Sequence, residues 1–312
     1  MKGRRDSALF SFAQMKTRLH FPLLIALGLE VCLCGSLPAQ TKAAGGTQPD
    51  AYTYRRVDGR EMKAFVFEPS HSDYSKPRAA MLVFHGGGWD QGSAQWTFEQ
   101  ARYFATLGMV GISVEYRLAN GESITPFDAA EDARAAIRWA RSQAGLFNID
   151  TKRIGAYGES AGGLLAAAAA ITGETPTKEE LNAVPDVLVL VSPALNVEKS
   201  AKFRALAGTR RDIASIEPGE HIRTGMPPMI ILTGALDAGI PPQMMRQFCE
   251  KMTRARNRCE LHIYPGVGHM LEAQEENAEA REMAKKTQFD AYLKADQFLA
   301  SLGYIPLEGE KK

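Results

Sequence analysis

Short apolar runs alternate with helix-like segments along most of the chain. A continuous apolar run is typical of a strand buried on both faces of a sheet, and an apolar repeat of three to four residues is typical of an amphipathic helix. Their alternation predicts an α/β fold, with a mostly parallel sheet and helices on both faces. The predicted strands are residues 79–84, 109–116, 153–158, 187–192, 229–233 and 260–264, and the predicted helices are residues 94–107, 127–144, 161–171, 244–255 and 291–302.

Two regions depart from this alternation. Residues 52–57 and 62–68 flank the pair Asp58 and Gly59, which is a sequence signal for a β-hairpin. Residues 197–227 have no regular pattern, and we expect them to form a small lid. The segment before the third strand is too short for a large cap domain.

The start of the chain has a different character. Basic residues within positions 2–18 precede an apolar run at residues 21–35, and Ala39 offers a small residue at a cleavage point. This order is typical of a secretory signal peptide at residues 1–39, so we expect export to the periplasm or the medium. The alternative is an uncleaved membrane anchor, although Glu30 interrupts a run shorter than the roughly 18–20 residues that span a bilayer.

The remaining chain is predicted to be a linker at residues 40–50, one domain at residues 51–305 and a tail at residues 306–312. The 312 residues carry a formal net charge of +1, and 23% of them are charged, which is ordinary for a globular protein. We therefore expect neither nucleic acid nor, after removal of the leader, a membrane as a partner. The charge-rich residues 272–286 are interpreted as a solvated helix face.

Four cysteines are present, and Cys32 and Cys34 lie in the predicted leader. Cys249 and Cys259 would remain, either as a disulfide in an oxidising compartment or as two buried thiols. Two cysteines are too few for a zinc cluster, and the histidines and carboxylates lack the close spacing of metal ligands. We therefore expect no metal and no cofactor, and the sequence does not predict the oligomeric state.

The strongest chemical motif is Gly-Glu-Ser-Ala-Gly at residues 158–162. It follows a predicted strand and opens a predicted helix, the context in which a G-x-S-x-G sequence forms a nucleophile elbow. The helix N-terminus also favours developing negative charge. The motif therefore predicts Ser160 as a nucleophile, the alternative being a glycine-rich turn with an incidental serine.

A second motif, His-Gly-Gly-Gly-Trp at residues 85–89, follows the strand at residues 79–84. Its glycines allow backbone N–H groups to point into a cavity. Acyl transfer needs such donors where the carbonyl oxygen becomes an oxyanion. The motif therefore predicts an oxyanion loop rather than a merely flexible one, with His85 orienting the loop.

A serine nucleophile needs a base, and the base needs an orienting acid. His269 lies in a glycine-rich loop directly after a predicted strand and is the best-placed base. Asp237 directly follows another strand and lies between the serine and the histidine in chain order, as the elbow fold requires. The less well placed candidates are His20 in the leader, His71 in a polar loop, His221 and Asp212 in the lid, His262 inside a strand and Asp186 before a strand.

These motifs resemble the hormone-sensitive-lipase-like esterases and the related feruloyl and acetyl-xylan esterases of the α/β-hydrolase superfamily. The resemblance covers roughly residues 60–300 and includes Val-Glu-Tyr-Arg-Leu at residues 114–118 and Asp132. It implies an α/β-hydrolase fold. It also implies the oxyanion-hole amides, which would come from Gly87, Gly88 and Ala161.

Two departures refine that implication. Glu159 stands where the family often has Asp, and the cap helices of the lipase-like branch are missing, which favours the smaller carbohydrate-esterase-like forms. The sequence thus predicts a serine ester hydrolase for short-chain or carbohydrate-linked esters, acetyl or feruloyl, whether small or attached to a polysaccharide. Trp89 and Glu159 are the candidate substrate-pocket residues, although Trp89 would equally fit the core. The alternatives are a peptidase of the same fold and a non-catalytic binding protein.

Overall fold

The computed structural model describes residues 48–70, 75–120, 123–171, 181–209 and 212–306. The predicted signal peptide, most of the linker and nearly all of the C-terminal tail lie outside the described residues.

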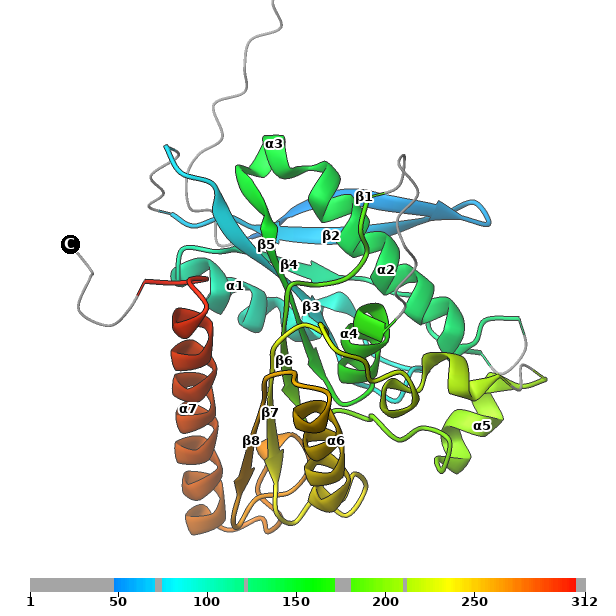
Figure 1. The fold of residues 1–312 in the computed structure, drawn as a ribbon, viewed down its shortest axis with the longest axis vertical. Helices are drawn as coiled ribbons and strands as arrows, with labels where there is room; N and C mark the ends of the chain where they lie inside the picture. Colours follow the sequence, from blue (N-terminus) through cyan, green and yellow to red (C-terminus); the bar gives the residue numbers. More distant parts are fainter. Residues whose placement is uncertain (1–47, 71–74, 121–122, 172–180, 210–211, 307–312) are drawn as a thin grey trace, which may run out of the picture. The chain divides into compact units, whose positions relative to one another are not determined.

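One sheet forms the centre of the domain, with eight strands among the described residues in the order β1-β2-β4-β3-β5-β6-β7-β8 (Figure 1). The β1–β2 and β2–β4 pairs are antiparallel, and all other neighbours are parallel, which confirms the predicted mostly parallel sheet. The strands are β1 (Asp50–Val57), β2 (Arg60–Phe67), β3 (Arg78–Phe84), β4 (Val110–Val114), β5 (Ile149–Glu159), β6 (Val187–Val191), β7 (Met229–Gly234) and β8 (Cys259–Tyr264).

The antiparallel edge begins with the predicted hairpin. Asp58 and Gly59 connect β1 to β2 and have φ angles of 48° and 76°. Two consecutive positive φ values are what a type I′ turn requires, which is why Asp-Gly suits this position.

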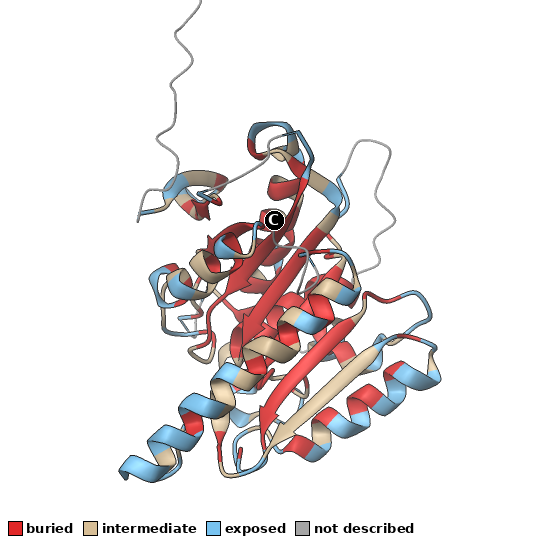
Figure 2. Ribbon diagram, turned by 90° about the vertical axis from the view of Figure 1, so that its left-hand side faces the viewer, coloured by how far each residue is buried: buried red, intermediate tan, exposed pale blue. Residues whose placement is uncertain are grey.

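Helices cover both faces of the sheet. In Figure 1, α1 and α7 lie on one face and α2, α4 and α6 on the other, each with its own set of buried apolar side chains. Figure 2 shows the central strands almost entirely buried and the edge strand β8 at intermediate burial. The helices are α1 (Phe98–Thr106), α2 (Pro126–Ser142), α3 (Ala144–Phe147), α4 (Ala161–Ile171), α5 (Ala201–Ala207), α6 (Pro242–Arg254) and α7 (Ala278–Ser301).

Helix α7 corrects the predicted boundary of the last helix. It is one helix of 24 residues that begins at Ala278 and not at residue 291, and Asn277 caps it by accepting a hydrogen bond from Ala280 N–H at 2.8 Å. Its first half is charged and mostly exposed, so it lacks the apolar repeat that marks its second half. Strand β5 similarly begins at Ile149, four residues before the predicted start, because the polar residues 150–152 separate Ile149 from the rest of the strand.

A buried ion cluster fixes the segment after β4 to α2. Asp132 on α2 is fully buried and accepts hydrogen bonds from Arg117 Nε at 2.8 Å and Arg55 Nη1 at 2.7 Å. The backbone N–H of Arg117 donates to the same carboxylate at 2.9 Å. The carboxylate therefore joins strand β1, the segment after β4 and helix α2 at one point.

The predicted lid contains short helices rather than an irregular loop. Besides α5 it holds two 3₁₀ helices, Ile213–Ile216 and Pro218–Glu220. Phe203 on α5 packs edge-on against Trp89, with 5.0 Å between ring centroids, and Lys202 pairs with Asp90 at 2.8 Å. The lid thus lies against the loop that follows β3.

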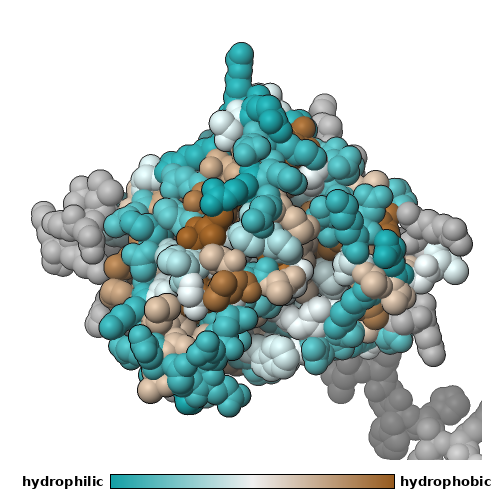
Figure 3. Space-filling model, turned by 90° about the horizontal axis from the view of Figure 1, so that it is seen from below, coloured by the Kyte–Doolittle hydropathy of each residue, from teal (hydrophilic) through white to brown (hydrophobic). Residues whose placement is uncertain are grey.

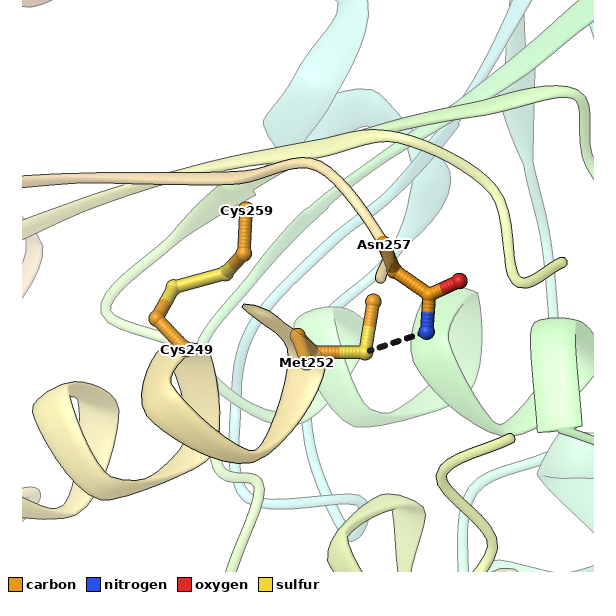
Figure 4. The surroundings of a disulfide bond; sticks show 4 residues. All are labelled: Cys249, Met252, Asn257 and Cys259. Carbon is orange, nitrogen blue, oxygen red and sulfur yellow. Dashed lines mark hydrogen bonds between the residues drawn. A yellow bond between two sulfur atoms is a disulfide. The ribbon is translucent and has the colours of Figure 1, made fainter. Parts of the chain in front are cut away.

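Cys249 on α6 and Cys259 at the start of β8 form a disulfide, with 5.3 Å between their Cα atoms (Figure 4). Asn257 lies in the short connection that the disulfide closes. Its Nδ2 donates to Met252 Sδ at 3.8 Å, and its Oδ1 accepts the N–H of Met226 at 3.0 Å. Of the two alternatives for the cysteines, the structure has the disulfide.

Candidate active site

Ser160 lies on a sharp turn between β5 and α4. Its φ of 50° is in the left-handed region, and its N–H donates to Val191 O at 3.0 Å. A Cβ at Gly158 would lie 2.3 Å from Gly162 O, and one at Gly162 would lie 2.2 Å from Phe84 O. Only glycine fits at these two positions, so the motif holds the serine in its strained conformation.

His269 connects Ser160 to Asp237. His269 Nε2 lies 2.9 Å from Ser160 Oγ, and His269 Nδ1 lies 2.7 Å from Asp237 Oδ2. The serine follows β5, the aspartate follows β7 and the histidine follows β8. Because these strands are parallel, the three side chains meet at the carboxyl ends of the strands. The structure therefore joins the predicted nucleophile, base and acid in one hydrogen-bonded chain.

The environment of Asp237 favours its charged form. Burial by itself would raise the pKa of this carboxyl, but hydrogen bonds from His269 and from Ile240 N–H, the latter at 2.8 Å, outweigh burial and lower the pKa. The Ser192 hydroxyl adds a further hydrogen bond. A carboxylate held in this way can orient the imidazole and stabilise its protonated form.

Ser192 is a part of the site that sequence reasoning missed. It follows β6, is fully buried and has a φ of 42°. Its Oγ accepts a hydrogen bond from Met270 N–H at 3.0 Å, so it supports the loop of His269 as well as Asp237. The only sequence signal is a Ser-Pro pair at the end of a buried strand.

The loop after β3 is held by His85 and Tyr116. The His85 ring is buried and stacked on the Tyr116 ring, with 4.2 Å between centroids, and Tyr116 Oη donates to His85 O at 2.8 Å. His85 Nδ1 lies 2.6 Å from Gly86 O. Burial lowers the pKa of His85, so the ring favours its neutral form, which suits the predicted orienting role.

The three predicted oxyanion amides come from two segments, the loop after β3 and the start of α4. Gly87 and Gly88 have φ angles of 114° and 60°, a conformation that glycine adopts without strain. No described carbonyl accepts a hydrogen bond from either N–H. Ala161 is the first residue of α4, where a helix leaves its N–H groups without helical acceptors.

A cavity of about 220 Å³, which we call the lid-side cavity, opens onto the nucleophile. Ser160, His269, Gly88 and Trp89 line it together with residues of the lid. Trp89 is 4% exposed, so it packs in the core against α5 and also forms a wall of this cavity. The structure thus gives Trp89 both of the positions that the sequence left open.

Glu159 points away from the lid-side cavity and lines a second, larger one. Its carboxylate accepts a hydrogen bond from Tyr157 Oη at 2.6 Å. Burial raises the pKa of Glu159, and the nearby Glu272 raises it further, against the lowering effects of Tyr157 and His269. The predicted substrate-pocket residues Trp89 and Glu159 therefore belong to different cavities.

The outer surface at this end of the molecule is mostly hydrophilic. Figure 3 views the face below the carboxyl ends of β7 and β8, where hydrophobic side chains form only small groups. Among the described helices, none is long and apolar enough to cross a bilayer. The described residues also contain no group of three or more side chains suited to hold a metal ion.

Comparison with known proteins agrees with this geometry. Residues 81–217 match a family model described as the alpha/beta hydrolase fold. A thermophilic esterase from the planctomycete Thermogutta terrifontis is 30% identical, with a TM-score of 0.74 over 85% of this chain and 96% of that chain. The α/β-hydrolase fold predicted from the motifs is confirmed.

Curated relatives carry esterase names. Esterase LipC of Mycobacterium tuberculosis is 27% identical over 62% of this chain and 53% of its own length. Ethyl acetate hydrolase of Pseudomonas putida is 32% identical over 44% of this chain and 42% of its own length. The chain thus spans about half the length of these curated relatives. From its match to the Thermogutta esterase over nearly the whole of that chain, the protein belongs to the α/β-hydrolase family.

Proposed function

We propose that this protein is a serine carboxylic-ester hydrolase with Ser160 as nucleophile, His269 as base and Asp237 as orienting acid. The observation that carries the proposal is the unbroken chain of two hydrogen bonds, 2.9 Å and 2.7 Å, that links the three side chains. The esterase names of the similar proteins support the same reaction.

The reaction has two half-reactions. His269 Nε2 takes the proton of Ser160 Oγ while the oxygen attacks the ester carbonyl carbon. The carbon–oxygen bond to the alcohol then breaks, and His269 returns the proton to the leaving alcohol oxygen. Water attacks the acyl-enzyme with His269 as base, which releases the acid and restores the serine. No cofactor takes part in these steps.

The negative charge that develops on the carbonyl oxygen needs donors that are already in place. Gly87 and Gly88 lie in the loop beside the serine, and Ala161 N–H stands at the N-terminus of α4. These three amides are proposed to form the oxyanion hole. Removing one such donor typically costs roughly 100- to 1000-fold in rate.

The proposed substrates are short-chain or carbohydrate-linked esters with an acetyl or feruloyl group, small or attached to a polysaccharide. The hydrophilic face in Figure 3 supports a dissolved ester rather than one at a lipid surface. The name of one relative, ethyl acetate hydrolase, supports an acetyl group.

Export is part of the proposal and rests on the basic and apolar pattern of residues 1–39. The disulfide between Cys249 and Cys259 supports it, because disulfides persist in oxidising compartments. Sequencing the N-terminus of the protein recovered outside the cytoplasm tests it, since a retained leader would contradict cleavage.

Ser160→Ala tests the activity. Hydrolysis of 4-nitrophenyl acetate should fall to background, because the remaining groups have no nucleophile to activate. Ser142→Ala, at an exposed serine that ends α2, is the matched control and should retain full turnover. A fluorophosphonate probe should label the parent and not Ser160→Ala. Absence of labelling in the parent would favour a binding protein, and cleavage of peptide amides in preference to esters would favour a peptidase.

A further inference from the structure

The nucleophile stands in a wall between two cavities. The lid-side cavity lies on one side, and on the other lies a cavity of about 450 Å³ between the sheet, α1 and α7, which we call the α1–α7 cavity. Three chain segments build the wall. In each segment one residue lines the α1–α7 cavity, and its neighbour in sequence lines the lid-side cavity. The pairs are Gly87 with Gly88, Glu159 with Ser160, and Met270 with His269.

The distance between the α1–α7 cavity and the nucleophile is short. Gly86 lines this cavity, and a Cβ at Gly86 would lie 3.4 Å from Ser160 Cβ and 3.8 Å from Met270 Sδ. With glycine at position 86, no Cβ stands between Ser160 and this part of the lining. An acyl group on Ser160 Oγ that entered the α1–α7 cavity would pass beside Gly86.

The proton path decides which half of the ester enters which cavity. His269 must return its proton to the leaving alcohol oxygen, and His269 lines the lid-side cavity but not the α1–α7 cavity. The alcohol therefore leaves on the lid side. The acyl group, which stays on Ser160, points towards the α1–α7 cavity.

The inner walls of the α1–α7 cavity are mainly apolar and aromatic. Phe104 and Tyr157 pack edge-on, with 5.7 Å between ring centroids, and Tyr103 and Tyr292 lie with 4.8 Å between centroids. Aliphatic residues of β6 and β7 form the floor. The volume is within the range of about 300–1000 Å³ that is usual for small-molecule sites. An acetyl group would fill little of it, whereas a flat aromatic group would contact several rings.

Hydrogen-bond acceptors interrupt these apolar walls. Glu159 is 8% exposed, and its one described hydrogen bond, from Tyr157, engages a single carboxylate oxygen. The amide oxygen of Gln100 is buried on the same lining and accepts no hydrogen bond from the described residues. No Lys or Arg stands among the described residues that line the cavity. The lining therefore favours a ligand that donates a hydrogen bond, and its described residues include no Lys or Arg to pair with an acidic group.

We infer that the α1–α7 cavity is the acyl subsite of the proposed esterase and takes a flat aromatic acyl group whose hydroxyl donates to Glu159. The inference rests on the proposed function, because the acyl-enzyme on Ser160 gives the cavity its role. Among the proposed esters, this subsite favours those of a hydroxylated aromatic acid.

A substrate series with one common alcohol tests the inference. The methyl esters of 4-hydroxycinnamic, 4-methoxycinnamic, cinnamic and acetic acids differ only in the acyl group. We expect kcat/KM for the 4-hydroxycinnamate to exceed that for cinnamate by about tenfold or more, because a site built for a hydroxyl rejects the analogue without it. Turnover of the acetate with no preference for the hydroxylated acid would overturn the inference and leave the proposed function intact. No Ser160-dependent turnover of any ester would reject the proposed function itself.

Two variants test whether the acyl group occupies the α1–α7 cavity. Ala291→Phe places a ring inside the cavity from α7, and the ratio of kcat/KM for 4-hydroxycinnamate to that for acetate should fall at least tenfold. Gln297→Phe adds the same ring on the exposed side of α7 and should leave that ratio unchanged. An unchanged ratio in folded Ala291→Phe would place the acyl group elsewhere.

Glu159→Gln is a second test of the acyl subsite, and it can be used if Ala291→Phe does not fold. The amide keeps one oxygen for Tyr157 and replaces the other acceptor with a donor. The preference for 4-hydroxycinnamate over 4-methoxycinnamate should therefore fall about tenfold or reverse, since the methoxy oxygen only accepts. A general structural defect would lower both rates equally, and that result would remove Glu159 from the subsite.

Discussion

Asp237 and Glu159 are two buried carboxyl groups at the carboxyl ends of β7 and β5, and the structure surrounds them differently. They are 3% and 8% exposed. Asp237 receives hydrogen bonds from His269, Ile240 N–H and Ser192, and its pKa is lowered although burial opposes this. Glu159 receives one described hydrogen bond, and burial, its largest influence, raises its pKa.

The difference shows that burial alone does not decide the charge of a carboxyl group at this site. The number of donors that converge on it decides whether desolvation is outweighed. Asp237 has the environment of a group that must stay charged while the imidazole beside it gains a proton. Glu159 has the environment of a group that accepts a hydrogen bond from a neutral partner.

Asp237→Asn is the strongest test of this contrast. The amide keeps the shape but does not fix the imidazole in the tautomer whose Nε2 accepts the serine proton, so kcat for an acetate ester should fall about 10⁴-fold. Steady-state kinetics of the purified variant measure it. Asp212→Asn, at an exposed aspartate in the lid, is the matched control and should keep the parental kcat. A loss of less than tenfold in Asp237→Asn would mean that another group orients His269.

Asp132→Asn extends the comparison to a carboxylate held by cations. Asp132 is fully buried between Arg55 and Arg117, so its neutral replacement leaves buried guanidinium charge without a full partner. We expect the free energy of unfolding to fall by about 3 kcal/mol, the usual cost of breaking a buried ion pair. Urea unfolding measures it. Glu282→Gln removes a carboxylate from an ion pair with Lys286 in which both side chains are exposed, and it should cost no more than about 0.5 kcal/mol. Equal losses in the two variants would show that the burial of Asp132 has no energetic consequence.

Much of the fold was predictable because most of the parallel strands contain an apolar run, as β3, β6 and β7 do. Residues 161–171 were predicted as a helix, and α4 has those bounds. Boundaries failed where polar residues extend an element beyond its buried part, as at Ile149 in β5 and Ala278 in α7. The apolar pattern reports burial, and residues 151–152 of β5 and the start of α7 are exposed.

The positions of Ser160, Asp237 and His269 were predictable because each follows a strand of a parallel sheet, and the carboxyl ends of such strands meet at one edge. The role of Ser192 was not, and although Glu159 was predicted as a substrate-pocket residue, the cavity that it lines was not. Ser192 acts through a hydrogen bond to Met270, 78 positions along the chain, and no local pattern reports such a contact. Glu159 adjoins the nucleophile in sequence, yet the strand alternation turns its side chain to the opposite face.

Glu159→Gln should reveal the smallest effect, which is a pH dependence of stability. Because the folded-state pKa of Glu159 is raised, the parent has its full stability below the unfolded pKa, roughly 4.3, and loses stability as the pH rises through the folded pKa. The glutamine does not titrate. The difference in unfolding free energy, variant minus parent, should therefore grow as the pH rises from 4 to 8. Thermal unfolding at several pH values measures this difference. A difference that shrinks as the pH rises would mean that the fold stabilises Glu159 as a carboxylate, and its environment would then resemble that of Asp237 instead of opposing it.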